Sequence, residues 1–107
     1  MPDVSANADP ASAWLIWANG QSMGVGGTSA ASPFWAGLVA IAKMAYGQQA
    51  GLINGLLYAK PAALNDIIVG SNGLPAAAGY DCATGLGSPT FAVISALVGA
   101  VPPATNP

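Results

Sequence analysis

The chain has 107 residues and a formal net charge of −2, and charged residues make up only 6% of it, against about 25% in an ordinary soluble domain. Its two cationic side chains are both Lys, and it contains one Cys, no His and no Glu. Two cations cannot neutralise a run of phosphates, so we expect no nucleic-acid partner. The usual zinc sites and a Ser-His-Asp relay within the chain are excluded as well.

The sequence gives no sign of a membrane span or of a targeting segment. Residues 1–5 are neither basic nor followed by an apolar run, so we expect no signal peptide in this chain. The best apolar stretches, 34–42 and 91–101, are shorter than the ~20 residues that a span needs. We therefore expect no membrane partner.

Six charged side chains are few to cover the surface of a free domain. Either the surface is neutral and polar, or the chain is a piece of a larger protein, which would fold poorly alone or associate with itself or with another chain. Cys82 has no partner within the chain, so we expect a buried thiol or a disulfide to a cysteine elsewhere.

The first half of the chain predicts a hairpin followed by a long helix. Residues 13–25 contain two strand-forming runs around Asn19-Gly20, the strongest short signal for a hairpin. A helix is expected over residues 29–46, ending at Gly47. Apolar residues lie on every face of this helix, which is typical of a buried central helix.

The second half is more irregular. We expect a short helix over residues 55–59 capped by Asn54, then a short strand within 64–69. Glycine-rich loops follow, and a last helix is expected from about residue 90 to about 98. Residues 102–107 are expected to form a flexible tail.

Gly26-Gly27-Thr28-Ser29 stands at the start of the expected long helix. Two glycines allow a sharp turn that would expose the Ser29 hydroxyl beside free backbone amides, which can stabilise an oxyanion. The same residues also fit an ordinary Ser/Thr helix cap, which this short motif alone favours. A phosphate-binding loop is a weaker alternative, because Ser replaces the last glycine of G-x-G-x-x-G and the acidic residue expected about 20 positions on is missing.

Asp66 and Asp81 lie on either side of a loop rich in Gly, Ala and Pro. Two carboxylates and the carbonyl groups of an irregular loop are the oxygen ligands that calcium prefers. Two turn-capping aspartates explain the same pattern, and the residues alone favour this simpler interpretation.

Longer motifs carry a resemblance to a known family. The string GTSAASPFWAGL, residues 27–38, resembles the catalytic-serine segment of subtilisin-like serine peptidases. Together with PDVSANADP at 2–10, NDI at 65–67 and GYDCATGLGSP at 79–89, it resembles the C-terminal part of the sedolisins, the serine-carboxyl peptidases. The four blocks span nearly the whole chain in the family's order, although Trp35 stands where true subtilisins usually carry His.

The resemblance implies an α/β fold, with this chain as the C-terminal portion of a subtilisin-like parallel-sheet sandwich. Residues 1–101 would belong to the catalytic domain and would supply a hairpin, a buried central helix and calcium-binding loops. Ser29 matches the family's nucleophile, and its backbone N–H would form half of the oxyanion hole. The substrate would be a peptide or protein, cleaved at acidic pH.

In sedolisins a glutamate accepts the serine's proton, one aspartate supports that glutamate and another completes the oxyanion hole. The resemblance places all three upstream of this segment, so the partner implied is the upstream part of a peptidase chain, or a second copy. Because the nucleophile needs a base, we expect the chain alone to be inactive. Asp3 and Asp9 do not match the family's acidic positions.

The resemblance also favours a calcium ion as cofactor over simple turn caps. The implied ligands are two carboxylates and three backbone carbonyls: Asp66, Ile67, Ala77, Gly79 and Asp81. It further implies a parent protein that is secreted or extracytoplasmic. The alternative function is a calcium-binding fragment or interaction subunit without catalysis.

Overall fold

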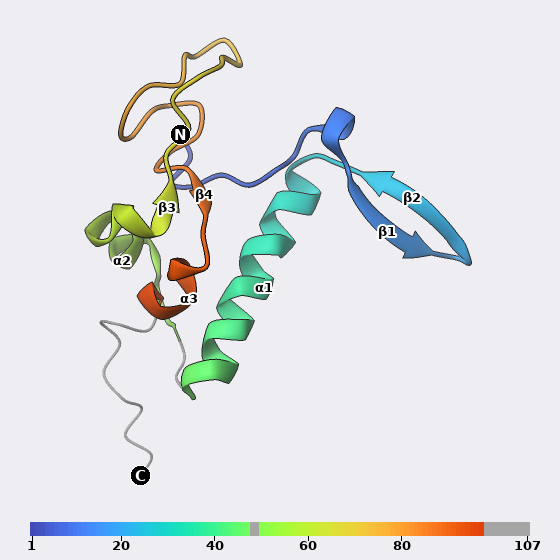
Figure 1. Ribbon diagram of the computed structural model, residues 1–107, viewed down its shortest axis with the longest axis horizontal. Helices are drawn as coiled ribbons and strands as arrows, with labels where there is room; N and C mark the ends of the chain where they lie inside the picture. Colours follow the sequence, from blue (N-terminus) through green and yellow to red (C-terminus); the bar gives the residue numbers. More distant parts are fainter. Residues whose placement is uncertain (48–49, 98–107) are drawn as a thin grey trace.

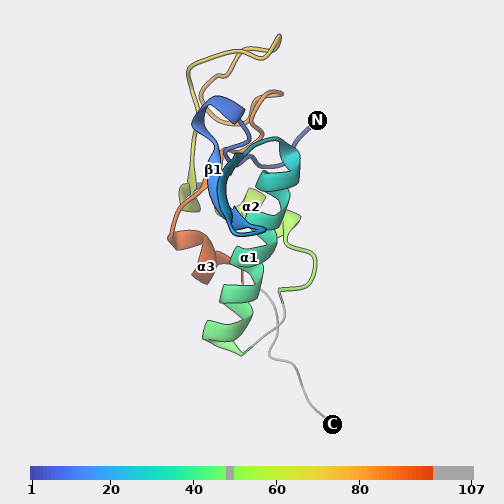
Figure 2. The same ribbon diagram turned by 90° about the vertical axis from the view of Figure 1, so that its right-hand side faces the viewer.

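The computed structural model describes residues 1–47 and 50–97, in which helix α1 (Thr28–Tyr46) runs between two other parts of the fold (Figure 1). A hairpin projects from one side of α1, and two short helices with a short strand pair lie on the other. The molecule measures 48 × 41 × 20 Å and is thin when seen from the side (Figure 2). The remaining elements are β1 (Trp14–Ala18), β2 (Gln21–Val25), α2 (Asn54–Ala59), β3 (Leu64–Asn65), β4 (Ser88–Pro89) and α3 (Ala92–Ala96), with 3-10 turns at Pro10–Ser12 and Pro61–Ala63.

The predicted hairpin is confirmed. Strands β1 and β2 pair antiparallel, from Trp14 opposite Val25 to Ala18 opposite Gln21. The two-residue turn is Asn19-Gly20, with φ of 52° and 74°. Both central residues therefore have the positive φ that a type I′ turn requires, which is why this dipeptide predicts a hairpin so well.

The long helix is confirmed almost to the residue, since α1 begins at Thr28 and is followed by Gly47. The burial that its apolar pattern indicates is not reached within the described residues, as expected of a piece of a larger protein. Ala42 is the one residue of α1 that is fully buried, while the Met44 side chain is 87% exposed. The apolar pattern is present, but the described part of the chain covers only one side of the helix.

The later elements are shorter than predicted. The expected strand over 64–69 is reduced to two residues, because β4 offers only two residues to pair with it. The last helix spans Ala92–Ala96, and residue 98 and the predicted tail lie outside the described residues. Both strand pairs in the described ranges are antiparallel, so the parallel sheet expected from the resemblance is not found among them. None of the described helices is long and apolar enough to span a membrane.

The hydrophobic core is small and lies between α1, α2 and α3. Leu57, Val93 and Leu97 are its largest fully buried side chains. Other large apolar side chains are exposed, including Trp17 at 74% and Phe91 at 92%. Cys82 is an exposed free thiol, so the expectation of a buried thiol is wrong.

A close packing of loops at Gly87 gives a testable stability prediction. Gly87 has φ 114°, and a Cβ there would meet the backbone of Asn65 and approach the Asp66 Cα to 3.2 Å. Gly73 has a similar φ of 103°, but a Cβ there would meet nothing within 4 Å. We expect Gly87→Ala to lower the free energy of unfolding by about 1–3 kcal/mol more than Gly73→Ala, because only the former adds a steric clash. Urea unfolding of both variants measures the difference, and equal losses would contradict it.

Candidate active site

Ser29 lies in the first turn of α1, on the surface of the molecule. The N-cap residue is Gly27, and no side chain caps the helix, so the interpretation of Thr28 or Ser29 as a cap is wrong. The Ser29 hydroxyl makes no hydrogen bond within the ranges 1–47 and 50–97. An exposed and unengaged hydroxyl at a helix start is free to meet an incoming carbonyl group.

The two glycines before Ser29 fix the turn in different ways. Gly27 adopts φ 90°, a conformation that side chains rarely allow, and its N–H donates to the Ala8 carbonyl at 2.6 Å. Gly26 packs so closely that a Cβ would lie 2.8 Å from the Pro10 backbone. The segment before the hairpin therefore holds the start of α1 in place.

The backbone amides of the first turn include a free donor at Ser29. The amides of Ala30 and Ala31 both donate to the Gly27 carbonyl, at 3.0 and 3.3 Å. The Ser29 N–H has no partner among the described residues, as expected of an amide in the first turn of a helix. The positive end of the helix dipole adds to its attraction for a negative charge. The arrangement can therefore donate one hydrogen bond to an oxyanion beside the hydroxyl.

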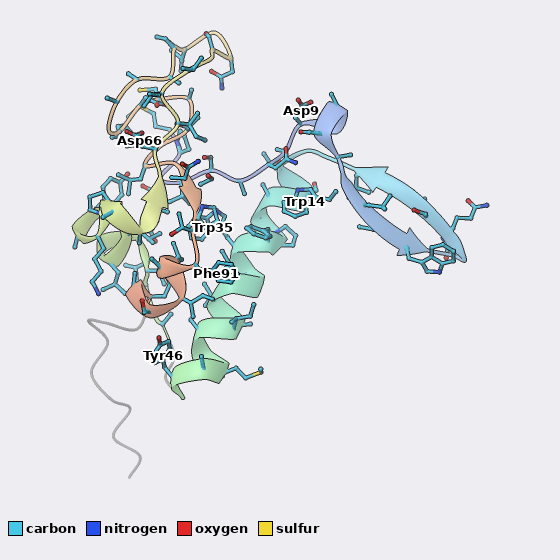
Figure 3. All side chains as sticks on the ribbon, viewed as in Figure 1. Asp9, Trp14, Trp35, Tyr46, Asp66 and Phe91 are labelled. Carbon is cyan, nitrogen blue, oxygen red and sulfur yellow. The ribbon has the colours of Figure 1, made fainter. Side chains whose placement is uncertain are left out.

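The carboxylates of the N-terminal segment serve other contacts. Asp9, near the start of the hairpin (Figure 3), accepts a hydrogen bond from the Ala11 N–H at 2.9 Å and so caps a 3-10 turn. Asp3 accepts hydrogen bonds from the Asn54 amide and the Tyr58 hydroxyl, both at 2.8 Å. The sequence predicted Asn54 as the cap of α2, and this prediction is wrong. Asn54 lies inside the helix, and its side chain binds the N-terminal segment.

The contact with Asp3 predicts that Tyr58 ionises at a higher pH than an ordinary tyrosine. The hydrogen bond to Asp3 is the main cause that raises the pKa of Tyr58 from 10.0 to about 12. Because the folded state holds the phenol proton more tightly, the contribution to stability is complete below pH 10 and is lost as the pH rises through 12. In an absorbance titration we expect Tyr58→Phe to remove the tyrosine step near pH 12. Asp3→Ala should move that step back toward pH 10, and an unchanged step in Asp3→Ala would contradict the assignment.

Asp66 and Asp81 reach the same stretch of loop. The Gly79 N–H donates to Asp66 Oδ2 at 2.7 Å, and the Ala77 N–H donates to Asp81 Oδ2 at 3.1 Å. Asp66 lies at the base of the loops that extend beyond β3 (Figure 3). The structure thus brings both predicted carboxylates to the segment that contains two of the three predicted carbonyl ligands, Ala77 and Gly79.

Asp81 is buried and holds the loop together by hydrogen bonds. Its Oδ1 accepts the N–H groups of Ala83 and Thr84 at 2.9 and 2.7 Å, and the Thr84 hydroxyl lies 3.0 Å from both carboxylate oxygens. These bonds, led by the Thr84 amide, lower the pKa of Asp81. The sequence analysis missed Thr84, although Asp followed three residues later by Thr is a recognisable pattern for a side-chain turn.

The loop contains oxygen donors of the kind that calcium prefers. The carbonyl oxygens of Ile67, Ala77 and Gly79 accept no hydrogen bond in the part of the chain that the structure describes. Three free carbonyls and two carboxylates are hard oxygen ligands in an irregular loop, which suits calcium. The described residues hold no cluster of three or more His, Cys, Asp or Glu, so carbonyls would have to complete such a site.

The chain resembles known peptidases in sequence. It is 39% identical over 97 residues to kumamolisin from Bacillus sp. (strain MN-32), a match that covers 83% of this chain and 18% of the relative. It is 43% identical over 101 residues to tripeptidyl-peptidase SED1 from Arthroderma otae, covering 84% of this chain and 15% of the relative. The chain thus spans less than a fifth of the length of these relatives. No family model matches it.

A solved structure is similar as well. The chain superposes on Pseudomonas sedolisin, a serine-carboxyl proteinase solved in complex with two molecules of pseudo-iodotyrostatin, with a TM-score of 0.80 and 32% sequence identity. That match covers 94% of this chain and 30% of the solved one, which assigns the subtilisin-like α/β fold. The curated homologues are peptidases of the same kind, and the chain therefore matches the C-terminal part of the sedolisin family of serine-carboxyl peptidases.

Proposed function

We propose that this chain carries the nucleophile of a serine-carboxyl peptidase that hydrolyses peptide bonds of peptides or proteins at acidic pH. The observation that carries the proposal is the position of Ser29, exposed in the first turn of α1 with an unengaged hydroxyl and a free backbone N–H. The homologues are serine-carboxyl peptidases, which supports the same chemistry for this serine.

In the proposed reaction, the Ser29 Oγ attacks the carbonyl carbon of the scissile bond. Its proton passes to a carboxylate from outside these 107 residues, since the sequence contains no Glu or His. The Ser29 N–H donates a hydrogen bond to the oxyanion that forms. The proton then goes to the leaving amine, and water hydrolyses the acyl-enzyme. We accordingly expect the isolated chain to be inactive.

The test is covalent labelling of Ser29. A peptide aldehyde forms a hemiacetal with an activated serine, so it should label this chain at acidic pH once the rest of a catalytic domain is present. The isolated chain and a Ser29→Ala variant should remain unlabelled. Labelling that persists in Ser29→Ala would overturn the assignment.

A second candidate function is calcium binding by the loop between Asp66 and Asp81. The three free carbonyl groups beside two carboxylates favour it. The bound ion would supply positive charge that pins the loops beyond β3, and it would compete with the Ala77 and Gly79 N–H groups for the carboxylate oxygens. The proposed parent peptidase is secreted or extracytoplasmic, an environment in which calcium sites are common. The test is a substitution of one carboxylate ligand, which should abolish the rise in melting temperature that calcium causes.

A further inference from the structure

The chain contains three Asn-Gly dipeptides, at residues 19–20, 54–55 and 72–73. In this dipeptide the glycine nitrogen can attack the side-chain carbon of the preceding asparagine, because glycine has no Cβ to hinder the approach. The backbone must rotate about the asparagine Cα–C bond to bring the two atoms together. The fold around each dipeptide therefore decides which of them reacts.

Two of the dipeptides are held in conformations that keep these atoms apart. Residues 19–20 form the type I′ turn between β1 and β2, and the pairing of the two strands fixes the dihedral angles of this turn. Asn54 has the dihedral angles of helix α2, and its side-chain Nδ2 donates to Asp3 at 2.8 Å. At both places the structure must open locally before the reaction can occur.

The third dipeptide lies at the exposed tip of a loop beyond β3, away from the helices (Figure 1). The Ala76 N–H closes this loop by donating to the Gly70 carbonyl at 2.9 Å. Among the described residues, the hydrogen bonds of residues 71–75 all stay within the loop. A Cβ at Gly73 would meet nothing within 4 Å. No other part of the described fold therefore has to release Asn72 before it reacts.

Two hydrogen bonds at the loop tip favour the reaction. The Leu74 N–H donates to Asn72 Oδ1 at 3.2 Å, which folds the side chain back over the Gly73 peptide group. The same N–H stabilises the negative charge that Oδ1 gains when its carbon is attacked. The Gly73 N–H donates to Ser71 Oγ at 3.1 Å, and this acceptor helps to withdraw the proton that the attacking nitrogen must lose.

We propose that Asn72 is a site of spontaneous modification, at which the loop converts its own side-chain amide into a carboxylate. The Gly73 nitrogen loses its proton and forms a bond to the Asn72 side-chain carbon. The bond from that carbon to Nδ2 breaks, ammonia leaves with the proton, and a succinimide ring remains. Water then opens the ring at either carbonyl and gives aspartate or isoaspartate at position 72. The reaction requires only water and makes the net charge of the chain, now −2, more negative.

The new carboxylate would lie among the loops that contain the predicted calcium ligands. Asn72 lines a cavity of about 140 Å³ together with Ile67 and Thr84. The modification would thus add a hard oxygen ligand beside Ile67. It depends neither on peptidase activity nor on calcium binding, so either of those proposals can fail without affecting it.

Mass spectrometry compares the three dipeptides in one sample of the full 107-residue chain, incubated at mildly alkaline pH. Chymotryptic peptides reveal the replacement of an amide by a carboxyl group, and an isoaspartate methyltransferase detects the isoaspartate. We expect conversion of Asn72 at least about tenfold faster than that of Asn19 or Asn54, since those two react only after local opening. In concentrated urea the three rates should agree within about threefold.

Substitutions at residues 71 and 72 test the role of the loop. Ser71→Ala removes the acceptor of the Gly73 N–H and should slow conversion of Asn72 roughly fivefold in the folded chain. Ser71→Thr keeps the hydroxyl and should react within about twofold of the parent chain. Asn72→Gln should abolish the product at this position, because the longer side chain would have to close a larger and less favourable ring.

Equal conversion of the three asparagines in native buffer would overturn the proposal, as would faster conversion of Asn19 or Asn54. An unchanged rate in Ser71→Ala would remove Ser71 from the mechanism. Slower conversion of Asn72 in native buffer than in urea would show that the loop protects this side chain, which is the opposite of what we propose.

Discussion

Replacement of Ser29 by Ala is expected to abolish peptidase activity in a chimera of Bacillus kumamolisin whose 97 aligned residues are replaced by those of this chain. We expect kcat to fall by about 10³-fold or more, because loss of a nucleophile removes covalent catalysis and leaves only binding and oxyanion stabilisation. Initial rates on a peptide substrate at acidic pH measure the change. A matching loss of aldehyde labelling should accompany it.

The control for this experiment is Ser22→Ala. Ser22 is also exposed, on β2, and its hydroxyl likewise makes no hydrogen bond within the described residues, but it lies outside the first turn of α1. Its removal should leave the rate within about twofold. A chimera that folds but neither cleaves peptides nor reacts with the aldehyde would contradict the proposed function.

Calcium is expected to stabilise the chain through the loop between Asp66 and Asp81. At a free calcium concentration a hundredfold above Kd, binding to the folded state alone adds about 2.7 kcal/mol. For a domain of this size, each 1 kcal/mol corresponds to roughly 4–8 °C in Tm. Thermal melts with added calcium and with chelator should therefore differ by more than about 10 °C.

Two substitutions separate ligation from simple loop stability. Asp81→Asn should abolish the calcium response, but it also weakens the hydrogen bonds to Ala83 and Thr84. Asp66 is exposed and, among the described residues, accepts only the Gly79 N–H, so Asp66→Asn should keep the fold in chelator and still lose the response. Asp9→Asn, which changes a carboxylate on the other side of the fold, should retain it. A full calcium shift in Asp66→Asn would rule out the proposed ligand set.

The parts of the fold that could be predicted from the sequence depend on short-range chemistry. Asn19-Gly20 sets the hairpin because its two positive φ angles are a property of those residues. Helix α1 is bounded by Gly27 and Gly47, whose positive φ angles of 90° and 68° lie outside the right-handed helical range and suit glycine. The predicted length of the strand within 64–69 was wrong, because that length depends on β4, whose two residues come from a distant part of the sequence. The apolar pattern of α1 indicates a helix that is buried in a larger structure, and its full burial depends on neighbours that the described residues do not provide.

The candidate site divides in the same way. Local glycine geometry at 26–27 makes the exposure of Ser29 predictable, and the structure agrees with it. Family resemblance, rather than spacing, linked Asp66 with Asp81, and the structure brings both to one loop segment. The partnership of Asp3 with Asn54 and Tyr58 was not predictable, because it joins residues more than 50 positions apart. The roles of Ser29 and of the calcium ligands remain predictions.

The close contact between Gly26 and the Pro10 backbone also bears on how the specificity or pH range of such a peptidase could be altered in the laboratory. In a mutant library that randomises this turn, few variants at positions 26 and 27 would fold. A side chain at 26 would collide with the Pro10 backbone, and one at 27 would strain the main chain. Thr28 is exposed and caps nothing, so diversity introduced there would survive selection for folding. Thr28, next to the proposed nucleophile Ser29, is thus a better position than 26 or 27 at which to begin directed evolution.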